Sequence, residues 1–158
     1  MSPTSPFQGT VTRELIVAAK TLRAHFEQVL AAEGEALSTF VVLDAVSRDE
    51  GCSQRALADG VRLEGATMTR HLDRLGTEGL VTRRRDPIDR RVLLVELTSA
   101  GRSTHEHLRE IMRNAHDACW KGIPERDRET TRRVAIRLSE NVAALDEQRD
   151  RTAQEVGR

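Results

Sequence analysis

Residues 65–101 read GATMTRHLDRLGTEGLVTRRRDPIDRRVLLVELTSAG and contain three structural signals in succession. Met68, Leu72 and Leu75 recur at helical spacing on one face, which predicts a helix that packs inward. Gly79 can end that helix, and two β-rich segments separated by a polar turn follow it. A helix, a turn and a hairpin in this order predict a unit that contacts a nucleic-acid duplex twice, once with the helix and once with the hairpin.

The outer face of the predicted helix has the side chains expected of a helix that enters a DNA groove. Small and hydroxylated residues let the backbone approach the groove floor, and arginines donate bidentate hydrogen bonds to guanine edges or phosphates. The predicted base-reading residues are Ala66, Thr67, Thr69 and Arg70, and Arg74 is predicted to hold a phosphate. The same pattern also suits an ordinary amphipathic surface helix.

Arginines dominate the predicted hairpin. Residues 80–82 begin its first strand, Arg83, Arg84 and Arg85 continue it, and residues 92–97 have the β-branched and apolar content of a return strand. Such a hairpin is suited to following phosphates and probing a minor groove, so the three arginines are predicted phosphate ligands. A solvated, charged hairpin protected against edge pairing is the alternative. The helix directly before the hairpin makes DNA binding the stronger interpretation.

At these residues the chain resembles the MarR family of bacterial winged-helix transcription regulators. Several short motifs, which occur together at the family's spacing, carry the resemblance. They are SQRALA at 53–58, TMTRHLDRL at 67–75, GLV at 79–81, RR at 83–84, DRR at 89–91, and LT at 97–98 followed by Gly101. The resemblance covers residues 37–101 tightly and the flanking helices only by pattern. It implies a mainly α fold with a small β-hairpin wing, in which a winged helix-turn-helix is flanked by dimerisation helices.

The resemblance also implies roles for residues at the edges of this unit. Arg91 resembles the family's minor-groove arginine, with Arg90 as the alternative at the hairpin tip, and Asp89 is expected to orient an arginine. Ser53 and Gln54 would face a phosphate if the family's docking holds. Ser53 is equally suited to a capping role, because its hydroxyl can accept a free backbone N–H of the helix that follows.

The composition is that of one globular domain without a global excess of positive charge. The 158 residues are 38% hydrophobic, and 25 basic and 25 acidic residues give a formal net charge of zero. Residues 70–91 nevertheless contain seven arginines and four acidic residues, so their net charge is +3. We divide the chain into an arm with a dimerisation helix (residues 1–36), the winged helix-turn-helix (37–100) and C-terminal dimerisation helices (101–158).

Other classes of protein find little support in the sequence. Residues 1–9 lack the apolar core of a secretory signal, and no apolar run approaches the ~18 residues of a membrane span, so we expect a cytoplasmic protein. Cys52 and Cys119 are too few for a disulfide framework and too far apart for a CxxC metal pair. No zincin, phosphate-loop or nucleophile-elbow motif is present, which argues against an enzyme and against a cofactor.

Three further amphipathic helices are predicted, over residues 12–32, 99–121 and 125–150, with residues 151–158 expected to fray. They exceed what a DNA-reading module of this size requires. In the resemblance, these helices interleave with those of a second subunit, which implies a homodimer. Helix-turn-helix dimers hold their recognition helices about 34 Å apart, so a palindromic double-stranded DNA operator follows. A monomer with a three-helix cap is the alternative.

The leading function is a sequence-specific transcription regulator, most often a repressor in this family. Many relatives are released from DNA by small phenolic or carboxylate effectors, and the resemblance would place Arg23, Phe26 and Phe40 near the effector pocket, although both phenylalanines also suit a plain core. Three alternatives stay open. Cys52 could sense oxidants, the histidines at 25, 105, 107 and 116 could bind a metal, or the winged helix could serve as a protein-interaction adaptor.

Overall fold

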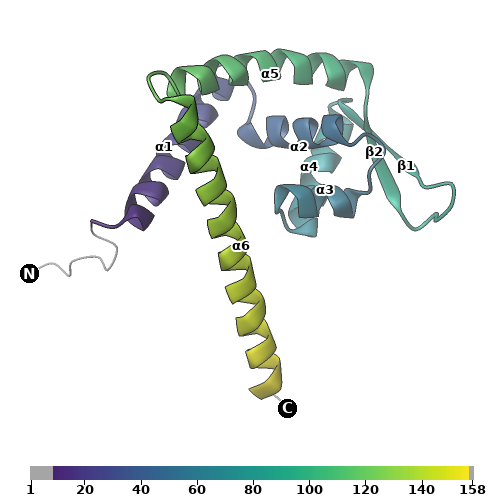
Figure 1. Cartoon of the computed structure of the whole chain (residues 1–158). Coiled ribbons are helices and arrows are strands. Elements are labelled where there is room, and N and C mark those ends of the chain that lie inside the picture. Colours follow the sequence, from purple (N-terminus) through teal and green to yellow (C-terminus); the bar gives the residue numbers. More distant parts are fainter. Residues whose placement is uncertain (1–8, 157–158) are drawn as a thin grey trace, which may run out of the picture. The chain divides into compact units, whose positions relative to one another are not determined.

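The computed structural model describes residues 9–156, which form six helices and one antiparallel hairpin (Figure 1). In chain order the elements are α1 (Val11–Ala31), α2 (Leu37–Arg48), α3 (Gln54–Val61), α4 (Gly65–Thr77), β1 (Val81–Arg85), β2 (Leu93–Leu97), α5 (Ser99–Cys119) and α6 (Glu125–Val156). The chain divides into two compact units, residues 1–119 and residues 120–158. The predicted mainly α fold with a small β wing is confirmed.

The core of the first unit forms around α2, which packs against α1, α3, α4, α5 and β2. The predicted inward face of α4 is confirmed, because Met68, Leu72 and Leu75 are all fully buried. The buried residues that share one cluster with them are Val42, Leu43, Val46, Leu57, Ala58, Val81, Val95 and Leu97. The hydrophobic effect therefore fixes which face of α4 points inward and which face remains outside.

Local sequence signals set the ends of these helices as expected. Ser53 caps α3 by accepting the Ala56 N–H on its hydroxyl at 3.1 Å. Gly79 follows α4 with a φ of 73°, a left-handed conformation that glycine adopts at low cost. The helix-turn-helix itself turns at Arg62, the one non-glycine residue among residues 9–156 with a positive φ.

The wing consists of β1, β2 and their connecting turn, and Val81 pairs with Leu97 at its base while Arg85 pairs with Leu93 near its tip. The segment before α3 lies along the other edge of β2. Gly51 donates its backbone N–H to the Val95 carbonyl at 2.9 Å, and Val95 donates to the Cys52 carbonyl at 3.0 Å. Cys52 thus lies in a strand-like pairing that anchors the wing to the start of α3.

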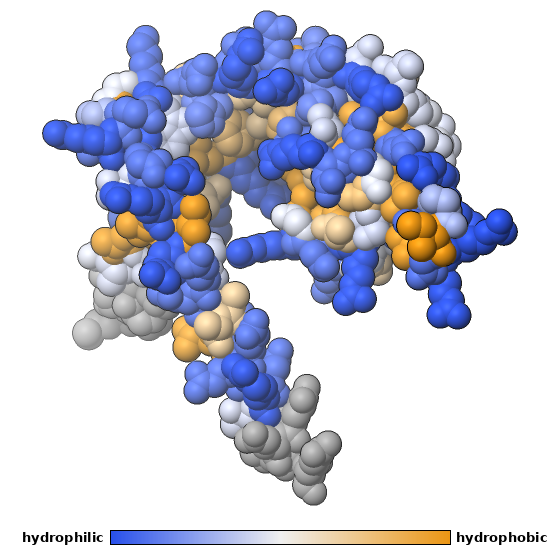
Figure 2. Space-filling view, turned by 45° about the vertical axis from the view of Figure 1, so that its right-hand side comes forward, coloured by the Kyte–Doolittle hydropathy of each residue, from blue (hydrophilic) through white to orange (hydrophobic). Residues whose placement is uncertain are grey.

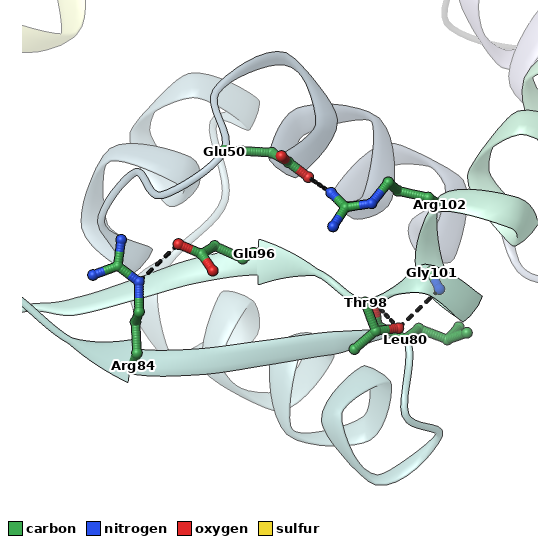
Figure 3. Close-up of polar contacts among 7 residues, drawn as sticks. All are labelled: Glu50, Leu80, Arg84, Glu96, Thr98, Gly101 and Arg102. Atoms are coloured by element: carbon green, nitrogen blue, oxygen red, sulfur yellow. Dashed lines mark hydrogen bonds and ion pairs between the residues drawn. The ribbon is translucent and has the colours of Figure 1, made fainter.

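A close backbone contact joins the base of the wing to α5 (Figure 3). The Thr98 hydroxyl donates to the carbonyls of Gly79 and Leu80, at 2.7 and 3.2 Å, and accepts the Gly101 N–H at 3.0 Å. A Cβ atom at position 101 would lie 1.9 Å from the Leu80 carbonyl oxygen. Only glycine therefore allows α5 to leave the wing at this angle.

In the second unit, Arg128 organises the turn that precedes α6. Its guanidinium lies 5.9 Å from the centre of the Trp120 ring and donates to the backbone carbonyls of Trp120 and Ile123 at 2.7 and 2.8 Å. The expected end of α6 near residue 150 is wrong, since the helix continues to Val156. Residues 151–156 contain no glycine or proline, so nothing local stops the helix there.

Within residues 9–156, no helix combines the length and the apolar character needed to cross a membrane.

Candidate nucleic-acid interface

Residues of α3, the start of α4 and the end of the wing near its tip border one groove of about 630 Å³. Four of the predicted DNA-contacting residues lie around it, namely Ser53, Gln54, Thr69 and Arg91. Ala66 is exposed at the start of α4 and Thr67 is half-buried beside it. The fold therefore brings residues from three separate segments, which the sequence could only assign one by one, to a single surface.

The side chain of Gln54 is directed toward Thr69 of α4 and not outward. The Gln54 amide donates to the Thr69 hydroxyl at 2.7 Å, and that hydroxyl donates to the Gly65 carbonyl one turn earlier at 2.9 Å. The Gln54 amide oxygen is buried and has no hydrogen-bond partner within residues 9–156. With its hydroxyl engaged in this way, Thr69 has mainly its methyl group to offer a base, as a contact to a thymine methyl requires.

The guanidinium of Arg74 makes contacts within the protein. It donates to the hydroxyl of Thr39, which is fully buried in α2, at 2.7 Å, and to the Glu78 carboxylate at 2.8 Å. A buried hydroxyl without a partner would cost free energy, so this contact ties α4 to α2. Arg74 therefore braces α4 against α2 in the free protein, and its predicted contact with a phosphate stays a prediction.

Each of the three consecutive arginines of β1 also has an intramolecular partner. Arg83 forms an ion pair with Asp73 of α4, and Arg84 donates to the Glu96 carboxylate on β2 at 2.7 Å (Figure 3). Arg85 donates to the backbone carbonyl of Arg90 across the turn at 2.7 Å. These contacts hold the wing in place, although exposed pairs of this kind contribute little each and could exchange for phosphates.

The guanidiniums of Arg70, Arg90 and Arg91 have no hydrogen-bond or ion-pair partner within the described residues, and all three side chains are exposed. Arg70 projects from α4, and the other two from the turn of the wing. Arg55, which sequence reasoning passed over, is exposed on α3 beside Gln54 and also lines the groove. Its position next to two predicted contact residues was the available signal.

Two aspartates build the turn of the wing. The Asp86 carboxylate accepts the backbone N–H groups of Ile88 and Asp89 at 2.6 and 3.2 Å. The Asp89 carboxylate accepts the Arg91 N–H at 3.0 Å. The role expected for Asp89, to orient an arginine, thus operates through the backbone of Arg91 and not through its guanidinium.

A second cavity, of about 730 Å³, lies between α1, α2 and α4. Arg23 lines it and donates to the Glu27 carboxylate at 2.8 Å, whereas Ser38, Thr67 and His71 line it from the other helices. Burial lowers the pKa of His71, and the nearby cations Arg74 and Arg70 lower it further. At neutral pH His71 is therefore uncharged and can accept a hydrogen bond.

Phe26 and Phe40, which were expected near an effector, do not line this cavity. Phe26 lies against His25, with ring centres 5.9 Å apart. Phe40 stacks on the buried ring of His105 at 6.2 Å, and the His105 Nε2 atom lies 3.2 Å from the Asp44 carboxylate. Phe40 thus belongs to the contact between α2 and α5.

The structure shows the surroundings of the two kinds of group suggested as sensors, the cysteine thiols and the histidines. Burial raises the pKa of the Cys52 thiol, and the Asp49 carboxylate raises it further, so little reactive thiolate forms. Cys52 and Cys119 are both free thiols. Among residues 9–156, no group of three or more histidine, cysteine, aspartate or glutamate side chains is arranged to hold a metal ion.

The contact between Arg74 and Thr39 predicts a loss of stability on truncation. Arg74→Ala leaves the buried Thr39 hydroxyl without its partner and should lower the free energy of unfolding by about 1 kcal/mol in urea denaturation. Arg70→Ala is the matched control on the exposed face of the same helix, and it should change that free energy by less than about 0.5 kcal/mol. Equal stability of the two variants would contradict the bracing role.

Comparisons with known proteins agree with this geometry. Residues 37–93 match the model of the MarR family. The chain is 29% identical over 127 residues to the uncharacterised HTH-type transcriptional regulator YdgJ of Bacillus subtilis. The matched region covers 80% of this chain and 76% of YdgJ. The structure of the present chain resembles that of Bordetella bronchiseptica BpsR, whose DNA binding is regulated by 6-hydroxynicotinic acid. The TM-score is 0.78 at 25% identity, and the match covers 86% of this chain and 97% of the BpsR chain.

A third comparison concerns the fold alone. A mutant of MarR from E. coli complexed with operator DNA superposes with a TM-score of 0.77 at 20% identity, over 85% of this chain and 99% of that one. The two curated relatives are HTH-type transcriptional regulators, which is the class predicted from the sequence. Over residues 37–93, the winged helix-turn-helix of this chain is therefore similar to that of the MarR family of transcription regulators.

Proposed function

We propose that the protein binds a palindromic DNA operator as a homodimer, represses transcription there, and is released by a small aromatic carboxylate or phenol. The DNA-binding part of this proposal rests on which arginines have partners within the protein and which do not. Four of the seven in residues 70–91 have intramolecular partners, whereas Arg70, Arg90 and Arg91 remain available on the recognition helix and the wing.

We assign the DNA contacts on this basis. Thr69 and Arg70 read base edges in the major groove, and Ala66 and Thr67 allow α4 to approach closely. Arg91 enters the minor groove, with Arg90 on the adjacent phosphates. Ser53 and Arg55 face the backbone from α3. Residues 74 and 83–85 act chiefly by holding α4 and the wing in position.

The role of Arg91 predicts a specific loss of affinity. Arg91→Ala should weaken binding to the operator by about 1–3 kcal/mol and should reduce the slope of log K against log salt by about 1, because the minor groove loses one cation that displaces counterions. Titrations of a fluorescent duplex at several salt concentrations measure both. Arg109→Ala removes an exposed cation from α5 and is the matched control. Unchanged affinity of Arg91→Ala at physiological salt would contradict the assignment.

The exposed apolar face of α6 is the observation that supports the proposed homodimer. Val134, Leu138, Val142 and Leu145 recur every three or four residues, and each is 44–64% exposed. Figure 2 shows orange and tan patches interrupting the blue surface of this helix, which leads to the grey C-terminal residues. A stripe of this kind is typical of a helix that packs against another helix, and a second copy would also supply the second recognition helix for a palindrome.

This stripe predicts the effect of a charge on oligomeric state. Leu138→Asp should convert the protein from dimer to monomer in light scattering after size exclusion, because dimerisation would bury the new carboxylate without a partner. Glu140→Lys, a charge change two residues away, should leave the dimer intact. A monomeric wild-type protein would favour the monomeric alternative, whereas a dimer that Leu138→Asp does not weaken would place the dimer interface outside this stripe.

The cavity between α1, α2 and α4 supports the effector part of the proposal. Arg23 can bind a carboxylate and neutral His71 can accept a hydrogen bond from a phenolic hydroxyl. DNA binding of the similar protein BpsR is regulated by 6-hydroxynicotinic acid, which carries a carboxyl group and a hydroxyl group on a pyridine ring. Because the cavity also touches Thr67 and His71 of α4, a ligand there would act directly on the recognition helix.

Release of the duplex by hydroxylated aromatic carboxylates tests this assignment. 6-Hydroxynicotinate or a related acid should dissociate the complex, and Arg23→Ala should raise the required concentration by about tenfold through loss of a charge-assisted hydrogen bond. Phe26→Leu, which changes a side chain outside the cavity, should leave it unchanged. Equal responses of Arg23→Ala and wild type would place the effector elsewhere.

A further inference from the structure

The turn of the wing carries an aliphatic side chain that almost nothing covers. Ile88 is 96% exposed, which is the highest value among the large hydrophobic side chains of residues 9–156. Single exposed apolar residues are common on protein surfaces, so exposure alone implies no function. Ile88 differs from such residues in how the wing tip, residues 86–92, holds its side chain and in the charges that surround it.

Hydrogen bonds fix the wing tip in one conformation. The Asp86 N–H donates to the Val92 carbonyl at 3.0 Å, and the Val92 N–H donates to the Asp89 carbonyl at 2.9 Å. The Asp86 carboxylate accepts the N–H of Ile88 itself at 2.6 Å. Ile88 is thus held at the outer end of a closed turn, following Pro87, whose ring restricts the backbone further. It does not fold back onto the wing.

The charges around Ile88 favour one kind of partner. Arg90 and Arg91 follow it on the same turn, and both guanidiniums are exposed without partners among the described residues. Both aspartates of the turn direct carboxylate oxygens to backbone N–H groups. The tip therefore presents an aliphatic group beside two cations. A DNA minor groove offers the complementary surface, since its walls combine apolar sugar faces with rows of phosphates.

We propose that Ile88 enters the minor groove beside Arg91 and packs against the sugar walls, adding an apolar contact to the electrostatic ones. This inference rests on the proposed operator binding. It assigns a DNA-contacting role to a residue whose side chain can neither donate nor accept a hydrogen bond. An apolar contact releases no counterions, so its contribution to affinity is independent of salt, unlike that of Arg91.

The test compares variants on a duplex that the wild-type protein has selected from a random pool. Ile88→Ser should weaken binding about tenfold, as expected for losing most of one aliphatic contact, with the slope of log K against log salt unchanged. Ile88→Leu, which keeps the aliphatic volume, should bind within about twofold of wild type. Arg91→Ala provides the contrasting case, because it should lower both the affinity and the slope.

The possible outcomes separate this inference from the operator proposal. If wild type selects a duplex and Ile88→Ser binds it as tightly as wild type, the apolar contact does not exist and the operator proposal stands. A loss for Ile88→Ser that also lowers the salt slope, or an equal loss for Ile88→Leu, would likewise overturn the contact. If wild type enriches no duplex, the operator proposal fails, and the inference about Ile88 fails with it.

Discussion

Burial of one face of α4 is the constraint on which the rest of the structure depends. Met68, Leu72 and Leu75 are fully excluded from water against α2, α3 and the wing, so α4 cannot rotate without exposing them. Its opposite face, with Thr69 and Arg70, is thereby fixed outward. The contact of Arg74 with buried Thr39 reinforces the same orientation with a directional hydrogen bond. The packing of the core thus determines which residues of α4 are available to contact DNA.

The arginines around this core divide into two groups with different physics. Those that pair with Asp73, Glu96 or a backbone carbonyl set the position of the wing relative to α4. Those at positions 70, 90 and 91, which have no partner among the described residues, supply positive potential on α4 and the wing tip. A protein with a formal net charge of zero can in this way present a cationic surface locally, without the general affinity for nucleic acids that a net positive charge brings.

Signals within a few residues of one another were predicted correctly from the sequence. The apolar period of α4, the cap at Ser53 and the glycine after α4 each depend on neighbouring residues only. The contacts of Gln54 with Thr69 and of Arg74 with Thr39 join residues 15 and 35 positions apart, so no local pattern announces them. For the same reason, helical periodicity could not show that Phe40 faces His105 rather than the cavity beside Arg23.

Selection from a random pool of duplexes by the purified protein tests the central claim most directly. A homodimer that binds a palindromic operator should enrich an inverted repeat whose half-sites are centred about one helical turn, or a multiple of it, apart. Binding of the enriched duplex should exceed that of a scrambled one and should fall steeply with salt. Enrichment of no sequence, or equal binding of both duplexes at every salt concentration, would contradict the account.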